Sequence, residues 1–335
     1  MRVVTLGQPA GLDQLELYNV AAPPSPGRGG LLVRVHASSL NFHDYGVVKG
    51  MIPVEAGRVP MSDGAGVVEA VGEGVDEFKV GDSVVSTFFP HWLEGPARVD
   101  NFSTVPGDGV DGYAREYVVR PATWFTHQPR GFSHAESATL TTAGLTAWRA
   151  LIVDGGLKAG DRVLVLGTGG VSVFALQFAH LMGARVIATT SSNEKAERLR
   201  ALGAEHVINY REAPEWGARV WELTDGEGVD HVVEVGGPGT LPQSIEAVRI
   251  GGHIALIGIL TGVEGNISTR ALMLKQARLQ GLIVGSRRHQ MEMIRAVESK
   301  GLRPVIDCRF PLEQLADAFR YQASGKHFGK ICVEI

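Results

Sequence analysis

Short apolar runs separated by glycines make up the first 120 residues of the chain. The runs read LLVRVHASSL, GAGVVEAVG, GDSVVSTFF and AREYVVR, and closely spaced glycines fall among them. β-branched residues favour strands, and glycine permits the positive φ angles of tight turns and barrel corners. The pattern therefore predicts a compact β-barrel.

The pattern changes near residue 133, where alanine and leucine recur at helical spacing. Ser133 followed by Glu136 predicts a capping box at the start of this helix. Farther on, strand-like and helix-length segments alternate. The predicted strands are 162–166, 185–189, 206–209, 229–235, 252–258 and 278–284. This alternation predicts a parallel sheet with helices on both faces, and six strands match a complete dinucleotide-binding fold.

The C-terminal segment contains two helical runs, a strand-like run PVIDCRF and a final strand GKICVEI. These pieces are too few to fold alone, so we expect them to complete the first domain. The nucleotide fold is then an insertion. The predicted domains are 1–125 with 287–335, and 126–286. The fold class predicted is α/β.

The segment VLVLGTGGVS ends a predicted strand with a glycine turn and opens a helix. A tight turn at Gly167 and close backbone approach at Gly169 or Gly170 suit a pyrophosphate, because the first N–H groups of a helix are unpaired and its dipole favours anions. Ser172 stands where the third fingerprint glycine is usual, and serine is small enough for the helix–strand contact there. The predicted contacts in this loop are Gly167, Thr168, Gly169, Gly170 and Val171.

The end of the second nucleotide-fold strand, ATTSSNEK, indicates which dinucleotide binds. An NAD site usually places an acid there, which would repel a 2′-phosphate. Here Thr190, Ser191 and Ser192 are neutral donors and Lys195 adds positive charge, so the segment predicts NADP(H). The alternative is that Ser191 or Ser192 caps the next helix, with Glu194 closing a capping box and Lys195 solvated.

Charge and cysteine content narrow the function class. A net charge of −4 and a pI near 6.3 argue against nucleic acid or an anionic membrane as partner, and no apolar run approaches a membrane span of about 20 residues. Cys308 and Cys332, the two cysteines, lie in strand-like runs where buried inert thiols are expected. We therefore expect small-molecule chemistry and a cytoplasmic location.

A series of motifs resembles the medium-chain dehydrogenase/reductase superfamily. The motifs include SSLNFHDYG, SDGAGVVEAVGEGVDEFKVGDSVV, DGYAREYVV, TTAGLTAWRAL, ALGAEHVINYR, GVDHVVEVGGPGTL and GKHFGKICV, together with the glycine turn. The resemblance covers essentially the whole chain and is closest to the zinc-independent, quinone-oxidoreductase-like branch. It implies a GroES-like β-barrel catalytic domain and a Rossmann domain.

The metal-dependent members of that superfamily hold zinc with two cysteines and a histidine. The matching positions here are Asn41, Ser62 and Thr142, and an amide with two hydroxyls does not replace thiolate and imidazole. Segment 88–112, which would carry four structural cysteines, has none. No short metal spacing links the histidines His36, His43 and His91. We therefore expect no metal.

Without a Lewis acid, simple alcohols are poor substrates, whereas quinones and α,β-unsaturated carbonyls accept hydride at carbon with hydrogen-bond support alone. The resemblance thus implies an NADPH-dependent reductase of a small apolar quinone or carbonyl. Two alternatives are a metal-free alcohol or aldehyde oxidoreductase and a non-catalytic NADPH-binding protein.

Five residues are candidates for the catalytic site. The amide of Asn41 could donate to the substrate oxygen, or Asn41 could be a turn residue. His43 and Tyr45 are candidate proton donors, although His43 could equally lie on a surface loop. Asp44 could anchor the loop or position the ribose and substrate. Thr142 is expected to face the nicotinamide, although packing alone also explains its helix.

Other expected contacts lie elsewhere in the chain. Ligands sit at the carboxyl ends of parallel strands, which predicts nicotinamide contacts from Gly236, Gly258, Ile259 and Leu260. The run HFGK resembles the family's C-terminal cofactor contact and implies Phe328 and Lys330.

Two further segments carry predictions. The aromatic segment 88–112 is expected to form a flap over the substrate or, alternatively, a satellite apolar cluster. The last strand, ARLQGLIVG, would be an exposed apolar edge in a monomer, so a homodimer is expected.

Overall fold

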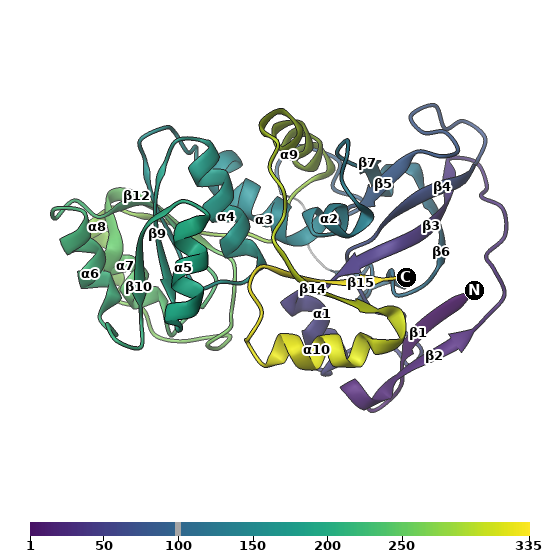
Figure 1. Cartoon of the computed structure of the whole chain (residues 1–335), viewed down its shortest axis with the longest axis horizontal. Coiled ribbons are helices and arrows are strands. Elements are labelled where there is room, and N and C mark those ends of the chain that lie inside the picture. The colour runs from purple at the N-terminus through teal and green to yellow at the C-terminus, as the bar shows by residue number, and fades with distance from the viewer. Residues whose placement is uncertain (98–101) are drawn as a thin grey trace. The chain divides into compact units, whose positions relative to one another are not determined.

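The computed structural model describes residues 1–97 and 102–335. The chain divides into two compact units, the first formed by 1–145 with 284–335 and the second by 146–283. Figure 1 labels the elements of both. Across the described residues, none of the helices has the length and apolar character that a membrane crossing needs.

The first unit contains a seven-stranded sheet with the order β14-β15-β3-β4-β5-β7, in which β6 also pairs with β3. Its strands are β3 (Gly30–Ser39), β4 (Ala65–Val71), β5 (Ser83–Ser86), β6 (Tyr117–Pro121), β7 (Phe125–His127), β14 (Ile306–Pro311) and β15 (Lys330–Glu334). A separate antiparallel pair joins β1 (Arg2–Leu6) and β2 (Leu15–Asn19). Because β15 pairs with β3, the C-terminal segment shares a sheet with the N-terminal strands.

Helices complete the first unit. They are α1 (Phe42–Val48), α2 (His134–Ala138), α9 (Arg287–Lys300) and α10 (Leu315–Ala323). The capping box predicted at Ser133 and Glu136 is confirmed at the start of α2. This helix packs on β3, β4 and β5, so the observed first boundary falls after residue 145 rather than at the predicted 125.

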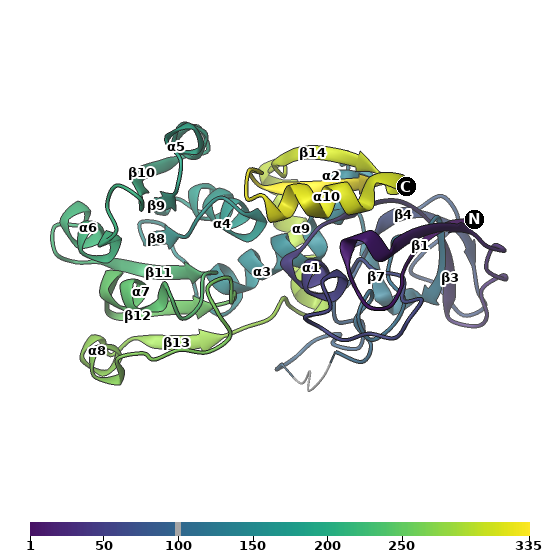
Figure 2. The same cartoon turned by 90° about the horizontal axis from the view of Figure 1, so that it is seen from below.

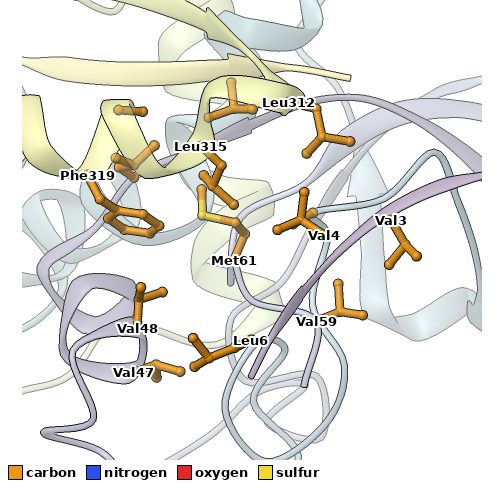
Figure 3. Packing of buried hydrophobic residues seen from close by; sticks show 14 of the residues in the cluster. Val3, Val4, Leu6, Val47, Val48, Val59, Met61, Leu312, Leu315 and Phe319 are labelled. Atoms are coloured by element: carbon orange, nitrogen blue, oxygen red, sulfur yellow. The ribbon is translucent and has the colours of Figure 1, made fainter. Parts of the chain in front are cut away.

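An apolar core joins β1, α1 and α10 within the first unit (Figure 3). Leu6 from β1, Val48 from α1 and Phe319 from α10 are all fully buried. Burying a side chain of this size stabilises the fold by about 1.5–3 kcal/mol. The core therefore fixes α1 against the C-terminal helix, and α1 carries several of the predicted site residues.

The second unit is a six-stranded parallel sheet with the order β10-β9-β8-β11-β12-β13 (Figure 2). Its strands are β8 (Arg162–Val165), β9 (Arg185–Thr190), β10 (Ala204–Asn209), β11 (Val229–Glu234), β12 (Val248–Leu256) and β13 (Arg278–Gly281). All six predicted strands are present, and the α/β class is confirmed. The strand order reverses between β8 and β11, which is where dinucleotides bind in this topology.

Helices alternate with these strands. They are α4 (Gly170–Leu181), α5 (Asn193–Ala201), α6 (Trp216–Leu223), α7 (Leu241–Ala247) and α8 (Thr269–Lys275), while α3 (Leu145–Trp148) lies at the unit boundary. Val232 and Ile254 from the sheet pack with Val220 from α6 and Ile245 from α7 in one buried cluster. The continuous apolar runs of the strands thus reflect a sheet packed on its helices.

Candidate active site

The glycine turn at the end of β8 has the shape that a dinucleotide loop needs. Gly167 has a φ of 73°, and its N–H donates to the Thr189 carbonyl at 3.0 Å. Gly169 is the N-cap residue of α4, and it has no side chain to cap the first N–H groups of that helix. A Cβ built on Gly169 would meet nothing within 4 Å. The backbone at Gly169 is therefore open to close approach, and a pyrophosphate there would lie beside the first N–H groups of α4.

Ser172 occupies the position where the third glycine of the dinucleotide fingerprint is usual. Its side chain is buried, and its hydroxyl donates to the Leu166 carbonyl at 2.6 Å. The serine thus fastens the first turn of α4 to the end of β8. The prediction that serine is small enough at this position is confirmed. Of the other predicted loop residues, Thr168 is buried and Val171 is partly buried.

A buried carboxylate organises the turn after β11, the neighbour of β8. Glu234 accepts hydrogen bonds from the N–H groups of Gly236 at 2.7 Å and Gly237 at 3.0 Å, and from the Thr240 hydroxyl at 2.6 Å. Glu234 is absent from the residues predicted from the sequence. Its only signal is its position as the last residue of a central strand.

The turn after β12 is joined to the turn after β11. The Thr261 hydroxyl donates to the Gly236 carbonyl at 2.8 Å. A Cβ on Gly258 would lie 2.0 Å from the Val235 carbonyl oxygen, so the two segments touch through backbone. Ile259 is 46% exposed and Leu260 is 57% exposed. The structure therefore brings the predicted residues Gly236, Gly258, Ile259 and Leu260 together at the carboxyl edge of the sheet.

Neutral hydroxyls end β9, as the sequence indicates. Thr190 is buried, and Ser191 and Ser192 are partly exposed. The N-cap of α5 is Ser192, whose hydroxyl accepts from the Lys195 N–H at 3.3 Å. Glu194 therefore occupies the second helical position, and the predicted capping box through Glu194 is wrong because the box needs the third.

The end of β10 adds residues that the sequence did not single out. The Tyr210 N–H donates to the Thr190 carbonyl at 2.9 Å, and Arg211 follows it. Both side chains are exposed. In the sequence, Tyr210 and Arg211 are indicated by the run INYR, which spans the end of the third nucleotide-fold strand. The residues present fit a dinucleotide, with the start of α4 for the pyrophosphate and hydroxyl groups at the end of β9.

A buried polar cluster lies in the first unit, and α1 begins it. Asn41 caps α1 in a capping box with Asp44. The Asn41 amide group donates to Asp44 Oδ2 at 3.1 Å and lies 3.4 Å from Ser62 Oγ. Asp44 also accepts from the Ser62 N–H at 2.8 Å. These contacts favour the turn-residue interpretation of Asn41 and the loop-anchoring one of Asp44.

Asp63 is the centre of this cluster. Its carboxyl group is fully buried and accepts from the hydroxyls of Ser39 at 2.5 Å and Thr142 at 2.6 Å. Burial raises the pKa of Asp63 to about 6, although Lys330 opposes the shift. Asp63 is not among the residues predicted from the sequence, where its signal is its position directly after Ser62.

Lys330 is buried within the same cluster. Its ammonium group donates to Asn41 Oδ1 at 2.6 Å and to the Leu40 carbonyl, and it lies 3.8 Å from Asp63 Oδ2. Burial lowers the pKa of Lys330. The nearby Phe328, predicted with it as a cofactor contact, is 1% exposed. The structure thus places both side chains in the interior of the first unit.

A zinc ion does not fit these donors. Asn41 Oδ1 already accepts from the Lys330 ammonium, and the Thr142 hydroxyl is held by Asp63. A positive ammonium beside the would-be ligands repels a divalent cation, and amide and hydroxyl groups are poor zinc ligands. Within residues 1–97 and 102–335, no group of three or more His, Cys, Asp or Glu side chains converges as a metal site would.

Tyr45 and His43, the two proton donors predicted from the sequence, both pack against aromatic rings. The Tyr45 ring lies 6.4 Å from the Phe319 ring, in the apolar core against α10. The His43 ring lies 5.4 Å from the Phe88 ring and 5.5 Å from the Phe102 ring. His43 Nε2 is 3.4 Å from Asp108 Oδ2, within ion-pair distance but outside hydrogen-bond geometry. His43 is therefore a partly buried residue of α1, and the surface-loop alternative is wrong.

The aromatic segment after β5 packs into a cluster. Phe88, Phe89 and Trp92 are buried, and the Phe89 ring lies 5.7 Å from the Phe102 ring. The carbonyl of Trp92 accepts from the Arg287 N–H at the start of α9. These contacts favour the satellite-cluster alternative for the described part of 88–112. Residues 98–101 of the predicted flap lie outside the described residues.

Two family models match the chain. Residues 27–130 match the alcohol dehydrogenase GroES-like domain, and residues 170–299 match the zinc-binding dehydrogenase model. The first match confirms the GroES-like fold predicted for the first domain. The second covers most of the parallel sheet.

Curated relatives match over nearly the full length. The chain is 40% identical to a zinc-type alcohol dehydrogenase-like protein of Schizosaccharomyces pombe, over 100% of this chain and 99% of that protein. It is 32% identical to the chloroplastic quinone-oxidoreductase QR1 of Triphysaria versicolor, over 98% of this chain and 95% of that protein.

Solved structures of dehydrogenases and reductases also match the whole chain. A candidate alcohol dehydrogenase of Sinorhizobium meliloti 1021 is 41% identical with a TM-score of 0.93, covering 100% of this chain and 99% of that one. An NAD-dependent alcohol dehydrogenase is 34% identical with a TM-score of 0.91, covering 100% of both chains. The crotonyl-CoA carboxylase/reductase AntE in complex with NADP is 26% identical with a TM-score of 0.90, covering 100% of this chain and 94% of that one.

Proposed function

Because the chain belongs to the medium-chain dehydrogenase/reductase superfamily, we propose that it is a zinc-independent, NADPH-dependent reductase of quinones or α,β-unsaturated carbonyls. Relatives of both the alcohol dehydrogenase and quinone oxidoreductase kinds make it an oxidoreductase. The cofactor preference and the acceptor are the parts that this proposal adds.

The observation that carries the proposal is the position of the Lys330 ammonium. It donates to Asn41, whose place in metal-dependent members holds a zinc-ligating cysteine, and it lies 3.8 Å from Asp63. A fixed side-chain cation thus occupies the polar cluster that would otherwise need a metal. This arrangement supports an acceptor that requires no Lewis acid.

Electron-poor acceptors meet that requirement. When bound, NADPH supplies a hydride, and a quinone or enone takes it at carbon while charge moves to oxygen. The chain's own task is then to orient the acceptor, exclude water and hold a proton near the oxygen.

The choice of NADPH rests on the end of β9 and on one class of neighbour. Thr190, Ser191 and Ser192 carry no negative charge that would repel a 2′-phosphate, and Lys195 and Arg211 are basic residues close to them in the sequence. The AntE neighbour was solved with NADP. The NAD-dependent alcohol dehydrogenase neighbour makes NAD the competing outcome.

One screen tests the proposal. Purified protein is given NADPH or NADH with a quinone, an enone, an aldehyde and, in the reverse direction, a simple alcohol, each with and without a chelator. We expect NADPH oxidation by the quinone or the enone that is insensitive to chelator. Turnover confined to aldehyde and alcohol would favour the metal-free alcohol oxidoreductase. Tight NADPH binding without turnover of any acceptor would leave a binding protein.

A further inference from the structure

The reduction of a quinone or enone needs a proton as well as a hydride, and its source is open. His43 and Tyr45 are the donors expected from the sequence. Tyr45 faces Phe319 in the apolar core, and His43 lies among the rings of Phe88 and Phe102. The polar cluster of the first unit holds the other candidate donors.

Thr142 and Asp63 form the pair in this cluster that reaches from the interior toward solvent. The Thr142 hydroxyl is 2.6 Å from Asp63 Oδ1. Asp63 is fully buried, whereas Thr142 is partly exposed. Thr142 lies in the π-helical turn Leu140–Gly144, and such turns occur frequently at functional sites because they displace side chains from the regular helical path.

We propose that Thr142 and Asp63 are the proton-delivery pair of the reaction, a proposal that rests on the proposed function. After the acceptor carbon has taken the hydride, the acceptor oxygen takes the hydroxyl proton of Thr142. In the same step Thr142 Oγ1 takes the carboxyl proton of Asp63. An enone leaves as the enol and a quinone as a tautomer of its quinol, the electron pair having come with the hydride, and Asp63 is left as a carboxylate. Water returns a proton to Asp63 through Thr142 once the product has left.

The surroundings of Asp63 suit both of its protonation states. Burial favours the protonated acid, with a pKa of about 6. The carboxylate left after transfer is stabilised by the Ser39 hydroxyl at 2.5 Å and by the Lys330 ammonium at 3.8 Å. The titratable groups that act on it are Lys330 from β15 and Asp44 from α1, with Tyr113 and Cys332 also close enough to interact.

The direction of the pH dependence follows from this role. The pair delivers a proton only while Asp63 is protonated, so turnover falls as pH rises through about 6. The interaction with Lys330 moves this limb to lower pH than burial alone would give. A pH-independent turnover between 5 and 8 would contradict the pair.

Removing the hydroxyl tests the proposal directly. Thr142→Val keeps the shape of the side chain and removes the relay atom, so we expect turnover with a quinone to fall about 100-fold, as for loss of a general acid. Thr142→Ser retains the hydroxyl and should restore most of the turnover and the limb near pH 6. Asp63→Asn should match Thr142→Val, and the double variant should be no slower than either single one.

Thr141→Val is the matched control. Thr141 is the adjacent residue of the same turn and donates to the Ser86 carbonyl at 2.9 Å instead of to Asp63. We expect it to lose some thermal stability and to keep the pH profile. Wild-type turnover and pH profile in Thr142→Val would overturn the proposal while the proposed function stands.

A second measurement needs no acceptor. The protonated carboxyl band of Asp63, identified in infrared spectra by its loss in Asp63→Asn, should titrate near pH 6 and shift to higher pH in Thr142→Val, which removes a donor to the carboxylate. If no acceptor oxidises NADPH, the proposed function fails, and this titration still tests the pair. An unchanged band in Thr142→Val would overturn the pairing.

Discussion

The ammonium nitrogen of Lys330 lies 3.8 Å from Oδ2 of Asp63, with both side chains buried in the first unit. The two residues are far apart in the chain and meet because β15 pairs with β3 in one sheet. A buried ion pair is stabilised only when further hydrogen bonds satisfy both charges. Here Asn41, Leu40 and Ser39 supply those bonds.

Breaking this pair should destabilise the first unit. Lys330→Met leaves the Asp63 carboxylate buried without its cation, and such a change costs about 3–5 kcal/mol of unfolding free energy. Urea denaturation at pH 7.5 measures it. Lys330→Met combined with Asp63→Leu removes both charges and should recover much of the loss. Equal stability of the single variant and wild type would show that the pair contributes nothing.

The dinucleotide preference can be reversed at the end of β9. Ser191→Asp places a carboxylate where a 2′-phosphate is expected, so we predict at least a tenfold loss of NADPH affinity, about 1.4 kcal/mol, with little change for NADH. Ser191→Asn has the same size without the charge and is the control. Fluorescence titration at low salt gives both affinities. Equal losses for NADPH and NADH would point to a distorted loop instead.

The fold was largely predictable from the sequence because it follows hydrophobic periodicity. The six nucleotide-fold strands are continuous apolar runs, and the cap at Ser133 and the contact at Ser172 depend on neighbours in the chain. The first domain boundary was not predictable, because α2 is a helix whose packing on β3 to β5 is a tertiary property.

The site was predictable only in part. The glycine turn and the hydroxyls after β9 are local motifs, and the structure shows them as expected. Asp63 and Lys330 meet through strand pairing, which no spacing reveals. Tyr45 was a candidate proton donor from the sequence, yet the helical turn directs its ring to Phe319. Side-chain direction decides such cases, and a motif alone does not supply it.

Metal removal gives a further prediction. The cluster of Asn41, Ser62 and Thr142 holds an ammonium and no soft ligands, so turnover should be unchanged after dialysis against a chelator. Elemental analysis of active protein should find zinc well below one ion per chain. Loss of turnover on chelation, restored by zinc, would contradict the zinc-independent proposal.

A homodimer through the second unit is also predicted. The strand β13 ends the parallel sheet, and Met273 and Leu274 on α8 are 67% and 58% exposed. An unpaired edge beside exposed apolar side chains favours association. Light scattering at micromolar concentration should give twice the mass of one chain. The double variant Met273→Glu, Leu274→Glu should halve that mass, and its monomer should unfold at the same temperature as wild type if each chain folds independently. A monomeric wild type would contradict the prediction.

Acid should destabilise the second unit through two buried histidines. Burial lowers the pKa of His253 to about 4, helped by the Arg278 guanidinium, and burial also lowers the pKa of His231. An unfolded histidine titrates near 6.5, so the unfolded chain binds more protons than the folded one below that pH. The unfolding free energy should therefore fall as pH drops from about 6.5 to 4.

The variant His253→Gln isolates this effect. Glutamine keeps an acceptor for Arg278, which donates to His253 Nδ1 at 3.0 Å, and it does not titrate. Asp63 acts in the opposite sense. Its raised pKa stabilises the folded state at low pH, and this stabilisation is lost as pH rises through about 6. The difference between wild type and His253→Gln cancels that contribution. Parallel stability curves for the two proteins between pH 4 and 7 would show that His253 is protonated as easily in the folded chain as in the unfolded one.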